Sequence, residues 1–308
     1  MPFPVYPEID PTVWEHPYDK AALATLRKIP KLDELLQMTL GSWSESEYLS
    51  VNQPKLKEVT ADSAPKLHRL YQEVLETFDV QEKWPLYLKN EPGVNAYAVG
   101  CNKPFVTLTL DAAQMEEPLV RMIMAHEIGH LLAGHGLYRT MLRFLLSVGW
   151  VSGVIPVKIP IYLGVVLAML EWRRCSEFTA DRASALAAGG AEPVVSVLNL
   201  FNDPETSFRP VMDKINAKVP EFMRPVVQDS LNGIRKLTQT HPDPSTRIEE
   251  LRRWCESPEF EAIQRGEYPR RGAAEMMAFP TGLQTDFDRL ADNTSRGLKE
   301  FWNSWNPF

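Results

Sequence analysis

The amino-acid sequence predicts an α+β fold that is mainly helical and contains one small antiparallel sheet. Most of the chain carries apolar residues at spacings of three and four, which is typical of amphipathic helices. Between residues 84 and 110 the pattern changes to short β-prone runs separated by Gly, Pro and Asn. Hydrophobic residues make up 44% of the 308 residues and charged residues 24%, which excludes a disordered or fibrous chain.

The N-terminal part of the chain reads as helices followed by strands. Helices are predicted over residues 18–28, 31–40 and 61–78. Strands are predicted over residues 85–88, 94–99 and 105–110. Because these runs are short and closely spaced along the chain, we expect them to form an antiparallel sheet.

Helical patterns resume after the sheet and continue along most of the remaining chain. One helix is expected from Pro118, a favourable first-turn residue, through His130 to Gly134. A second long helix is expected over residues 161–188, where Gly189–Gly190 closes it. Further helical segments follow to about residue 265. The tail carries apolar residues at spacings that suit an amphipathic helix.

The net charge argues against a nucleic-acid partner, and the cysteines argue against disulfide bonds and thiolate metal sites. The 33 Lys and Arg against 40 Asp and Glu give a net charge of −7, which argues against nucleic acid as a partner. The three cysteines, Cys101, Cys175 and Cys255, lie far apart and outside any CxxC pair. This pattern indicates neither a disulfide framework nor a thiolate metal site, and it fits a reducing compartment. The first residues lack a basic segment followed by an apolar run, so we expect a cytoplasmic protein.

Residues 126–130 form the motif His-Glu-x-x-His within a predicted helix. Because residues i and i+4 lie one turn apart on one helix face, His126 and His130 can reach one metal ion. A catalytic zinc takes three protein ligands and keeps one position open. Glu127 can then hold a water molecule beside the metal and remove its proton.

The third ligand decides between classes of zinc enzyme. In the class with the motif HExxHxxGxxH, a third histidine follows the second by six residues, and here that position is Gly136. That class is therefore excluded, and His135 is expected at a helix end or on the surface. Glu177 and Asp181, again four residues apart, offer a carboxylate ligand and an acceptor for a ligand histidine's free N–H. Taken alone, these two acidic residues fit a solvated helix face better than a metal site.

At this point the chain resembles a known family. HEIGHLLAGHGLYRT followed by RRCSEFTADRASALAA resembles the gluzincin metallopeptidases that include the CAAX prenyl proteases and the heat-shock protease HtpX. Residues 94–98 are similar to the NAxA strand of that family, and Thr240-His241-Pro242 with Arg247-Ile248 to its HP…R segment. The resemblance covers about residues 60–255. It implies a zincin-like catalytic domain over 61–265, with a helical N-terminal region over 1–60 and a C-terminal tail over 266–308.

Carried over residue by residue, the resemblance implies a ligand set. One Zn²⁺ per chain is bound by His126, His130 and Glu177, and Glu127 acts as general base and then as general acid. Asp181 orients a ligand histidine.

The resemblance also implies how a substrate is held. Asn95, Ala96 and Tyr97 lie on an edge strand that pairs with an extended peptide. His241 either stabilises the oxyanion or caps the metal in a latent state. An ordinary position at the start of the next helix, before Asp243 and Pro244, explains His241 equally well.

Residues 144–170 form an apolar run whose only charge is Lys158. Since His130 and Glu177 share one ion, the chain between them must cross a bilayer an even number of times. Two passes need about 40 apolar residues, more than the run provides. A packed hairpin, a re-entrant loop or a peripheral membrane contact remains. Arginines flank both ends and suit an anionic lipid surface or a solvated helix pair equally: Arg139, Arg143, Arg173 and Arg174.

These features predict a zinc-dependent endopeptidase that hydrolyses peptide bonds in protein substrates. The alternative from another class is a zinc-stabilised, latent or chaperone-like binding protein whose cleft is closed by the apolar run or by His241. The intact ligands and base favour the enzyme. The sequence leaves the substrate, the cleavage preference and the oligomeric state open.

Overall fold

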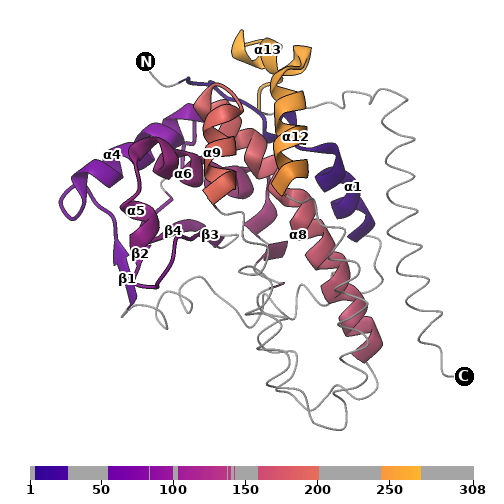
Figure 1. Ribbon diagram of the computed structural model, residues 1–308, viewed down its shortest axis with the longest axis horizontal. Helices are drawn as coiled ribbons and strands as arrows, with labels where there is room; N and C mark the ends of the chain where they lie inside the picture. The colour runs from indigo at the N-terminus through magenta and orange to yellow at the C-terminus, as the bar shows by residue number, and fades with distance from the viewer. Residues whose placement is uncertain are drawn as a thin grey trace, which may run out of the picture.

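The structure is a computed structural model, and it describes residues 4–26, 55–82, 84–99, 103–136, 138–139, 142, 159–200 and 244–271. Helices dominate these residues, and one small sheet lies at one side of them (Figure 1). In chain order the elements are η1 (Pro11–Val13), α1 (Pro17–Leu26), β1 (Leu56–Glu58), α4 (Pro65–Thr77), β2 (Leu86–Lys89), β3 (Ala96–Val99), β4 (Phe105–Thr109), α5 (Leu110–Ala113), α6 (Glu117–Leu132), α8 (Ile159–Ala188), α9 (Glu192–Leu200), α12 (Pro244–Cys255) and α13 (Pro258–Gln264).

The sheet has the strand order β1-β2-β4-β3 and is mixed. The predicted α+β class fits the structure, but the prediction of a purely antiparallel sheet is wrong, because β2 and β4 pair in parallel. All five residues of β4 are buried, and the strand takes an inner position in the sheet. β3 forms an antiparallel pair with β4 on its other side, which leaves β3 at the edge. β1, a short and largely exposed strand at the opposite edge, was not predicted.

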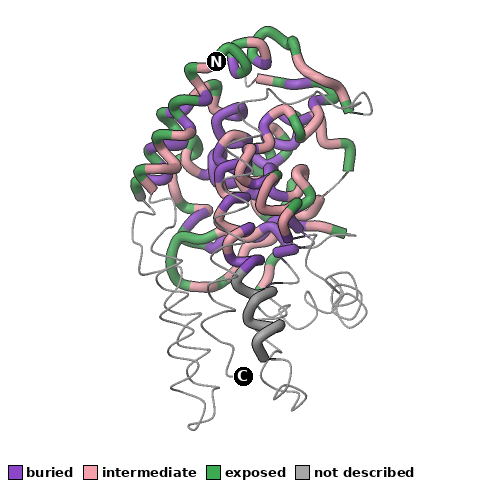
Figure 2. The backbone as a smooth tube through the Cα atoms, turned by 90° about the vertical axis from the view of Figure 1, so that its right-hand side faces the viewer, coloured by how far each residue is buried: buried purple, intermediate pink, exposed green. Residues whose placement is uncertain are grey.

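Helix α6 lies at the centre of the described fold and packs against α4, α8, α9 and the strands β3 and β4. Pro118 lies in its first turn as expected, and Gly134 follows its end with a positive φ of 72°. Its buried residues occupy almost the whole circumference of the helix. In Figure 2 the buried segments gather in the middle of the molecule, with exposed segments around them.

α6 and α8 approach each other closely at a glycine. A Cβ atom placed on Gly129 would lie 2.5 Å from Cβ of Ala183 and 3.5 Å from Cα of Ala180. Small residues on both helices therefore set their separation. This contact lies one residue before His130 and between Glu177 and the C-terminal turns of α8, so it also fixes how the predicted site residues face one another.

α8 confirms the predicted long helix and its glycine stop. Gly189 adopts a φ of 72°, and the N–H of Gly190 donates to the carbonyl of Ala185. The apolar run at 144–170 lies within the described residues only from 159 onward, where it forms the start of α8. Within the described part of the chain, no helix is long and apolar enough to cross a membrane.

The first residues of the chain pack into the same core as the helices that follow. Tyr6, Ile9 and Trp14 are each no more than 4% exposed and belong to one apolar cluster with α4, α6 and α8. Ile9 also forms a bridge with Arg270. The predicted helix over 31–40 and the helix in the tail lie outside the described residues, and the division at residues 60 and 265 stays a prediction.

Candidate functional site

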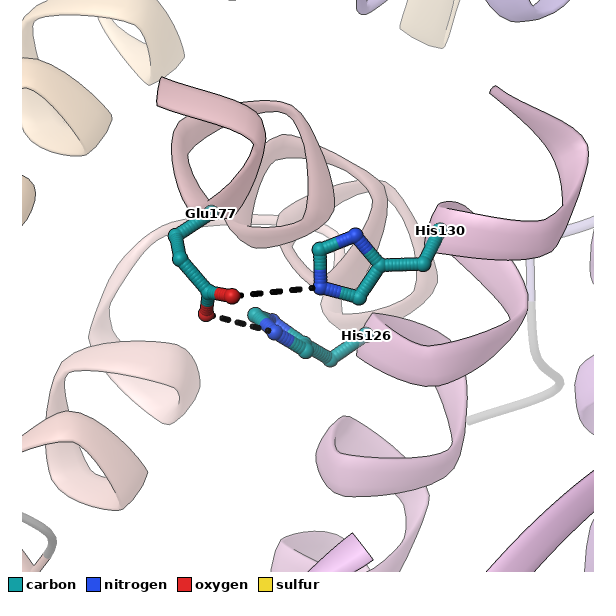
Figure 3. A group of neighbouring side chains, drawn as sticks. All are labelled: His126, His130 and Glu177. Atoms are coloured by element: carbon teal, nitrogen blue, oxygen red, sulfur yellow. Dashed lines mark ion pairs between the residues drawn. The ribbon is translucent and has the colours of Figure 1, made fainter. Parts of the chain in front are cut away.

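Three side chains from the two central helices point toward one another, as Figure 3 shows. His126 and His130 project from one face of α6, and Glu177 projects from α8. Nε2 of His126 lies 3.2 Å from Oε2 of Glu177, and Nε2 of His130 lies 3.5 Å from Oε1 of the same carboxylate. One ligand atom from each residue can be chosen so that all three lie within 4.8 Å of one another.

This donor set fits a zinc ion. Two imidazole nitrogens and one carboxylate oxygen are ligands that zinc takes in catalytic sites. Ligands at the usual zinc distance in tetrahedral geometry are separated by about 3.3 Å, close to the two histidine–carboxylate separations. His126 and Glu177 remain partly accessible, whereas His130 is fully buried, so the group opens toward solvent on one side.

The second nitrogen of His126 faces an acidic residue that is itself paired with an arginine. Nδ1 of His126 lies 3.3 Å from Oδ1 of Asp181. Arg247, from α12, donates to both oxygens of Asp181 at 2.7 Å and reaches Oε2 of Glu177 at 3.4 Å. Burial alone lowers the pKa of His126, but hydrogen bonds to Asp181 and Glu177 overcome it and raise the pKa to about 9. His126 is therefore held by carboxylates on both sides.

His130 meets the opposite environment. Burial lowers its pKa well below 6.5, and the positive charge of Arg139 lowers it further. Nη1 of Arg139 donates to Nε2 of His130 and lies 3.3 Å from Oε1 of Glu177. Arg139 is 7% exposed, so neither expectation for it, lipid contact or a solvated helix pair, is correct. It belongs to the interior beside the histidines.

The two acidic residues on α8 are held in their charged form. Burial raises the pKa of Glu177, but hydrogen bonds to His126 and His130 keep it well below 4.5. Burial likewise opposes ionisation of Asp181, and the charge of Arg247 together with the bond to His126 lowers its pKa below 3.8. The solvated-face alternative does not describe Asp181, which is 1% exposed.

Glu127 connects the central helix to the edge strand. Its Oε2 accepts a hydrogen bond of 2.6 Å from the backbone N–H of Ala98 on β3, and the residue is 5% exposed. It follows His126 directly in α6. The sequence did not indicate this anchor, because it depends on how β3 lies against α6.

The strand to which the resemblance assigns substrate binding lies at an edge of the sheet. Asn95 immediately precedes β3, which contains Ala96 and Tyr97. The N–H of Ala96 donates to Oδ1 of Asn95 at 2.9 Å, and the amide nitrogen of Asn95 donates to the hydroxyl of Tyr97 at 2.8 Å. Ala96 and Ala98 thus direct their N–H groups away from β4, and both groups have acceptors within the chain.

Two histidines complete the comparison with the sequence. His241 lies outside the described residues, although α12 begins at Pro244 as predicted. His135 was expected at a helix end or on the surface; it begins a helical segment just after α6, but the surface alternative is wrong, because it is 1% exposed. Its Nδ1 lies 2.8 Å from Nδ1 of His130, and its Nε2 lies 2.8 Å from Oδ2 of Asp19. Asp19 and Arg139 were not recognised as part of the site, and their spacing offers no signal for it.

An HExxH helix packed against a helix that contributes a carboxylate is the arrangement of a metallopeptidase. Residues 61–255 match the family model described as peptidase family M48, and the chain belongs to this family. It is also 28% identical over 277 residues to the plastoglobule-localized metallopeptidase 48, chloroplastic, of Arabidopsis thaliana. The aligned stretch covers 84% of this chain and 77% of that protein. No solved structure matches the chain significantly.

Proposed function

We propose that this metallopeptidase is a zinc-dependent endopeptidase that cleaves protein substrates, with one zinc ion per chain. The observation that carries the proposal is the convergence of His126, His130 and Glu177 within 4.8 Å. Bound there, zinc supplies a Lewis acid that polarises a peptide carbonyl and lowers the pKa of water. Asp181 fixes the ring of His126 through Nδ1, and Arg247 fixes Asp181 in turn.

Glu127 is proposed as the proton carrier. Its carboxylate takes a proton from the water that attacks the scissile carbonyl, and passes it to the leaving amine as the C–N bond breaks. The bond from the N–H of Ala98 supports this role, because it limits the rotation of the carboxylate between α6 and β3. His241 stays a proposal, either for oxyanion stabilisation or for capping the metal.

The substrate is proposed to add as an extended strand beside β3. The hydrogen bond between Asn95 and Ala96 restricts how a substrate strand can pair with β3. Since the outward N–H of Ala96 is bonded to the side chain of Asn95, an incoming peptide must displace that amide to use this donor. Substitution of Asn95 by alanine is therefore expected to free the donor.

The experiment is cleavage of unfolded casein by the parent protein and by Glu127→Gln, with zinc content measured on both. We expect the variant to keep zinc and lose turnover by at least ~100-fold, because the residue transfers a proton and does not bind the metal. Equal activity in the two proteins would contradict proton transfer by Glu127. A parent that binds zinc but cleaves nothing would favour the latent or chaperone-like alternative.

Location is a separate proposal. We propose a cytoplasmic protein whose apolar run at 144–170 packs as a hairpin on its own chain, with a peripheral membrane contact as the alternative; the Arabidopsis relative is named as plastoglobule-localized and chloroplastic. Co-sedimentation of the full chain with anionic and neutral vesicles tests the contact. Binding to anionic vesicles that Leu163→Asp abolishes supports it, and recovery of all protein in the supernatant contradicts it.

A further inference from the structure

A buried polar chain leads from the metal-binding helix to the N-terminal helix. Nδ1 of His130 lies 2.8 Å from Nδ1 of His135, and Nε2 of His135 lies 2.8 Å from Oδ2 of Asp19. All three residues are at most 1% exposed. Asp19 lies in the first turn of α1, outside residues 61–255 that match the family. The chain therefore connects the site to a segment beyond the matched region.

The direction of each hydrogen bond follows from the partners. Arginine can only donate, so Nε2 of His130 accepts from Arg139, and a neutral His130 carries its proton on Nδ1. That proton is donated to Nδ1 of His135, which must then carry its own proton on Nε2. Nε2 of His135 donates to the carboxylate of Asp19. Each bond thus has one donor and one acceptor.

Asp19 is built to stay in place. Its Oδ2 also accepts a 2.6 Å hydrogen bond from the hydroxyl of Thr179 on α8, and the hydroxyl accepts from the backbone N–H of His16. A negative charge in the first turn of α1 is favoured by the helix dipole. His135 is held edge-on against the ring of Trp172, with centroids 5.4 Å apart. Asp19 and His135 are therefore each held in place by further contacts besides the hydrogen bond between them.

We propose that Asp19 and His135 are positioning residues for the metal site, and that the N-terminal helix α1 completes the support of His130. The proposal rests on the proposed function in one respect, namely that His130 binds the metal through Nε2. Metal binding through Nε2 requires that Arg139 releases this atom and that the proton stays on Nδ1, which is the tautomer that the chain from Asp19 selects. An acceptor for this proton orients the imidazole ring and makes it a better ligand. His126 receives the same support from Asp181, so each ligand histidine has its own acidic partner, one direct and one through His135.

The experiment measures zinc affinity by chelator competition on the full-length protein. Asp19→Leu keeps the approximate size of the side chain but removes the acceptor, so affinity should fall about 10- to 100-fold. Asp19→Asn keeps an acceptor oxygen without the charge and should lose less than Asp19→Leu. Asp62→Asn is the matched control, because Asp62 is exposed and should bind zinc like the parent.

A double-mutant cycle separates positioning from packing. His135→Leu should weaken zinc binding about as much as Asp19→Leu, and the double variant should lose no more than either single one, because both act through one chain. Thr179→Val removes a neighbouring bond to Asp19 but leaves the chain to His130. It should lower the midpoint temperature of thermal unfolding and leave the zinc affinity close to that of the parent.

A second readout needs no metal. Long-range ¹H–¹⁵N NMR of the metal-free protein should show His130 protonated at Nδ1 in the parent, in Asp19→Asn and in His135→Leu, because Arg139 donates to Nε2 in all three. In His135→Leu the Nδ1 proton should lose the downfield shift of a hydrogen-bonded imidazole N–H, because its acceptor has been removed. The proposal is overturned if folded Asp19→Leu binds zinc as tightly as the parent, or if the two leucine variants are additive. Failure of the proposed function looks different, because then His130→Ala leaves zinc binding of the parent unchanged.

Discussion

His126 and His130 lie one turn apart on α6, yet their rings meet different surroundings. The His126 ring is 18% exposed and contacts two carboxylates, whereas the His130 ring is fully buried and contacts Arg139 and His135. The pKa of His126 is raised to about 9, and that of His130 is lowered well below 6.5. Identical residues of one motif are thus supported by different chemistry.

The two surroundings also come from different parts of the chain. The support of His126 comes from Asp181 and Arg247, which lie inside residues 61–255 that match the family. The support of His130 ends at Asp19, in a segment before that region. The comparison indicates that a short metal motif can depend on contacts that no local pattern reveals. Glu177, which touches both rings, is where the two sides meet.

The largest effect is expected where both sides are broken at once. Glu177→Ala removes the carboxylate shared by His126 and His130, so the variant should lose stoichiometric zinc. Glu171→Ala, on the same helix and paired with Arg174, is the control that should keep it. Zinc content after dialysis checks the difference. Unchanged zinc affinity in Glu177→Ala would refute the assignment of the third ligand.

The second effect tests the His126 side. Arg247→Met leaves the carboxylate of Asp181, whose side chain is 2% exposed, without its arginine, and breaking a buried ion pair costs about 3 kcal/mol or more. Adding Asp181→Asn should restore part of the stability, because it removes a buried carboxylate that is left with His126 as its partner once Arg247 is gone. Urea unfolding of the metal-free proteins measures both.

The control for Arg247 lies on the same helix. Arg252 makes a similar pair of bonds to Glu192, but both side chains are exposed. Arg252→Met should therefore change the unfolding midpoint far less than Arg247→Met. Equal losses in the two variants would mean that burial of the Asp181 pair does not matter.

How much of this arrangement could be predicted from the sequence depends on the distance between partners. The HExxH and ExxxD pairs were predictable because i, i+4 spacing alone places two side chains on one helix face. The parallel pairing of β2 with β4, the burial of His135 and its bond to Asp19 were not, since each depends on packing between segments far apart in the chain. Arg247 lay within the quoted HP…R segment, but only the structure shows that it holds Asp181.

The third effect concerns the N-terminal side and depends on pH. His16 is 3% exposed, stacks on Phe178, and has a pKa that burial lowers to about 4, although Glu250 raises it in part. Between about pH 6.5 and 4 the unfolded chain binds a proton that folded His16 does not, so stability is lost as pH falls through this window. The loss attributable to His16 reaches about 3 kcal/mol near pH 4.

A conservative variant isolates this titration. The Nδ1 of His16 accepts from the N–H of Tyr18 at the start of α1, and asparagine can replace it as a helix cap without titrating. His16→Asn should therefore show a weaker decline of unfolding free energy between pH 6.5 and 4.5 than the parent, both measured without metal. Parallel pH profiles would show that His16 does not stay neutral in the folded protein.

The smallest effect is expected from a change that disturbs the surroundings of His126 and His130 equally. In Gly129→Ala the new methyl group would lie 2.5 Å from Cβ of Ala183, an atom that cannot move without its helix, so α6 and α8 must separate slightly. Overpacking of this kind costs about 1–3 kcal/mol, and the better helix propensity of alanine offsets up to about 1 kcal/mol of it. Ala183→Gly should rescue the variant by removing the opposing methyl group.

Gly190→Ala is the control, because nothing lies within 4 Å of its added Cβ. Thermal unfolding and zinc affinity should move together in Gly129→Ala, since the shift alters the distance from both histidines to Glu177. A loss that Ala183→Gly fails to reverse would show that close helix contact does not set the geometry of the site.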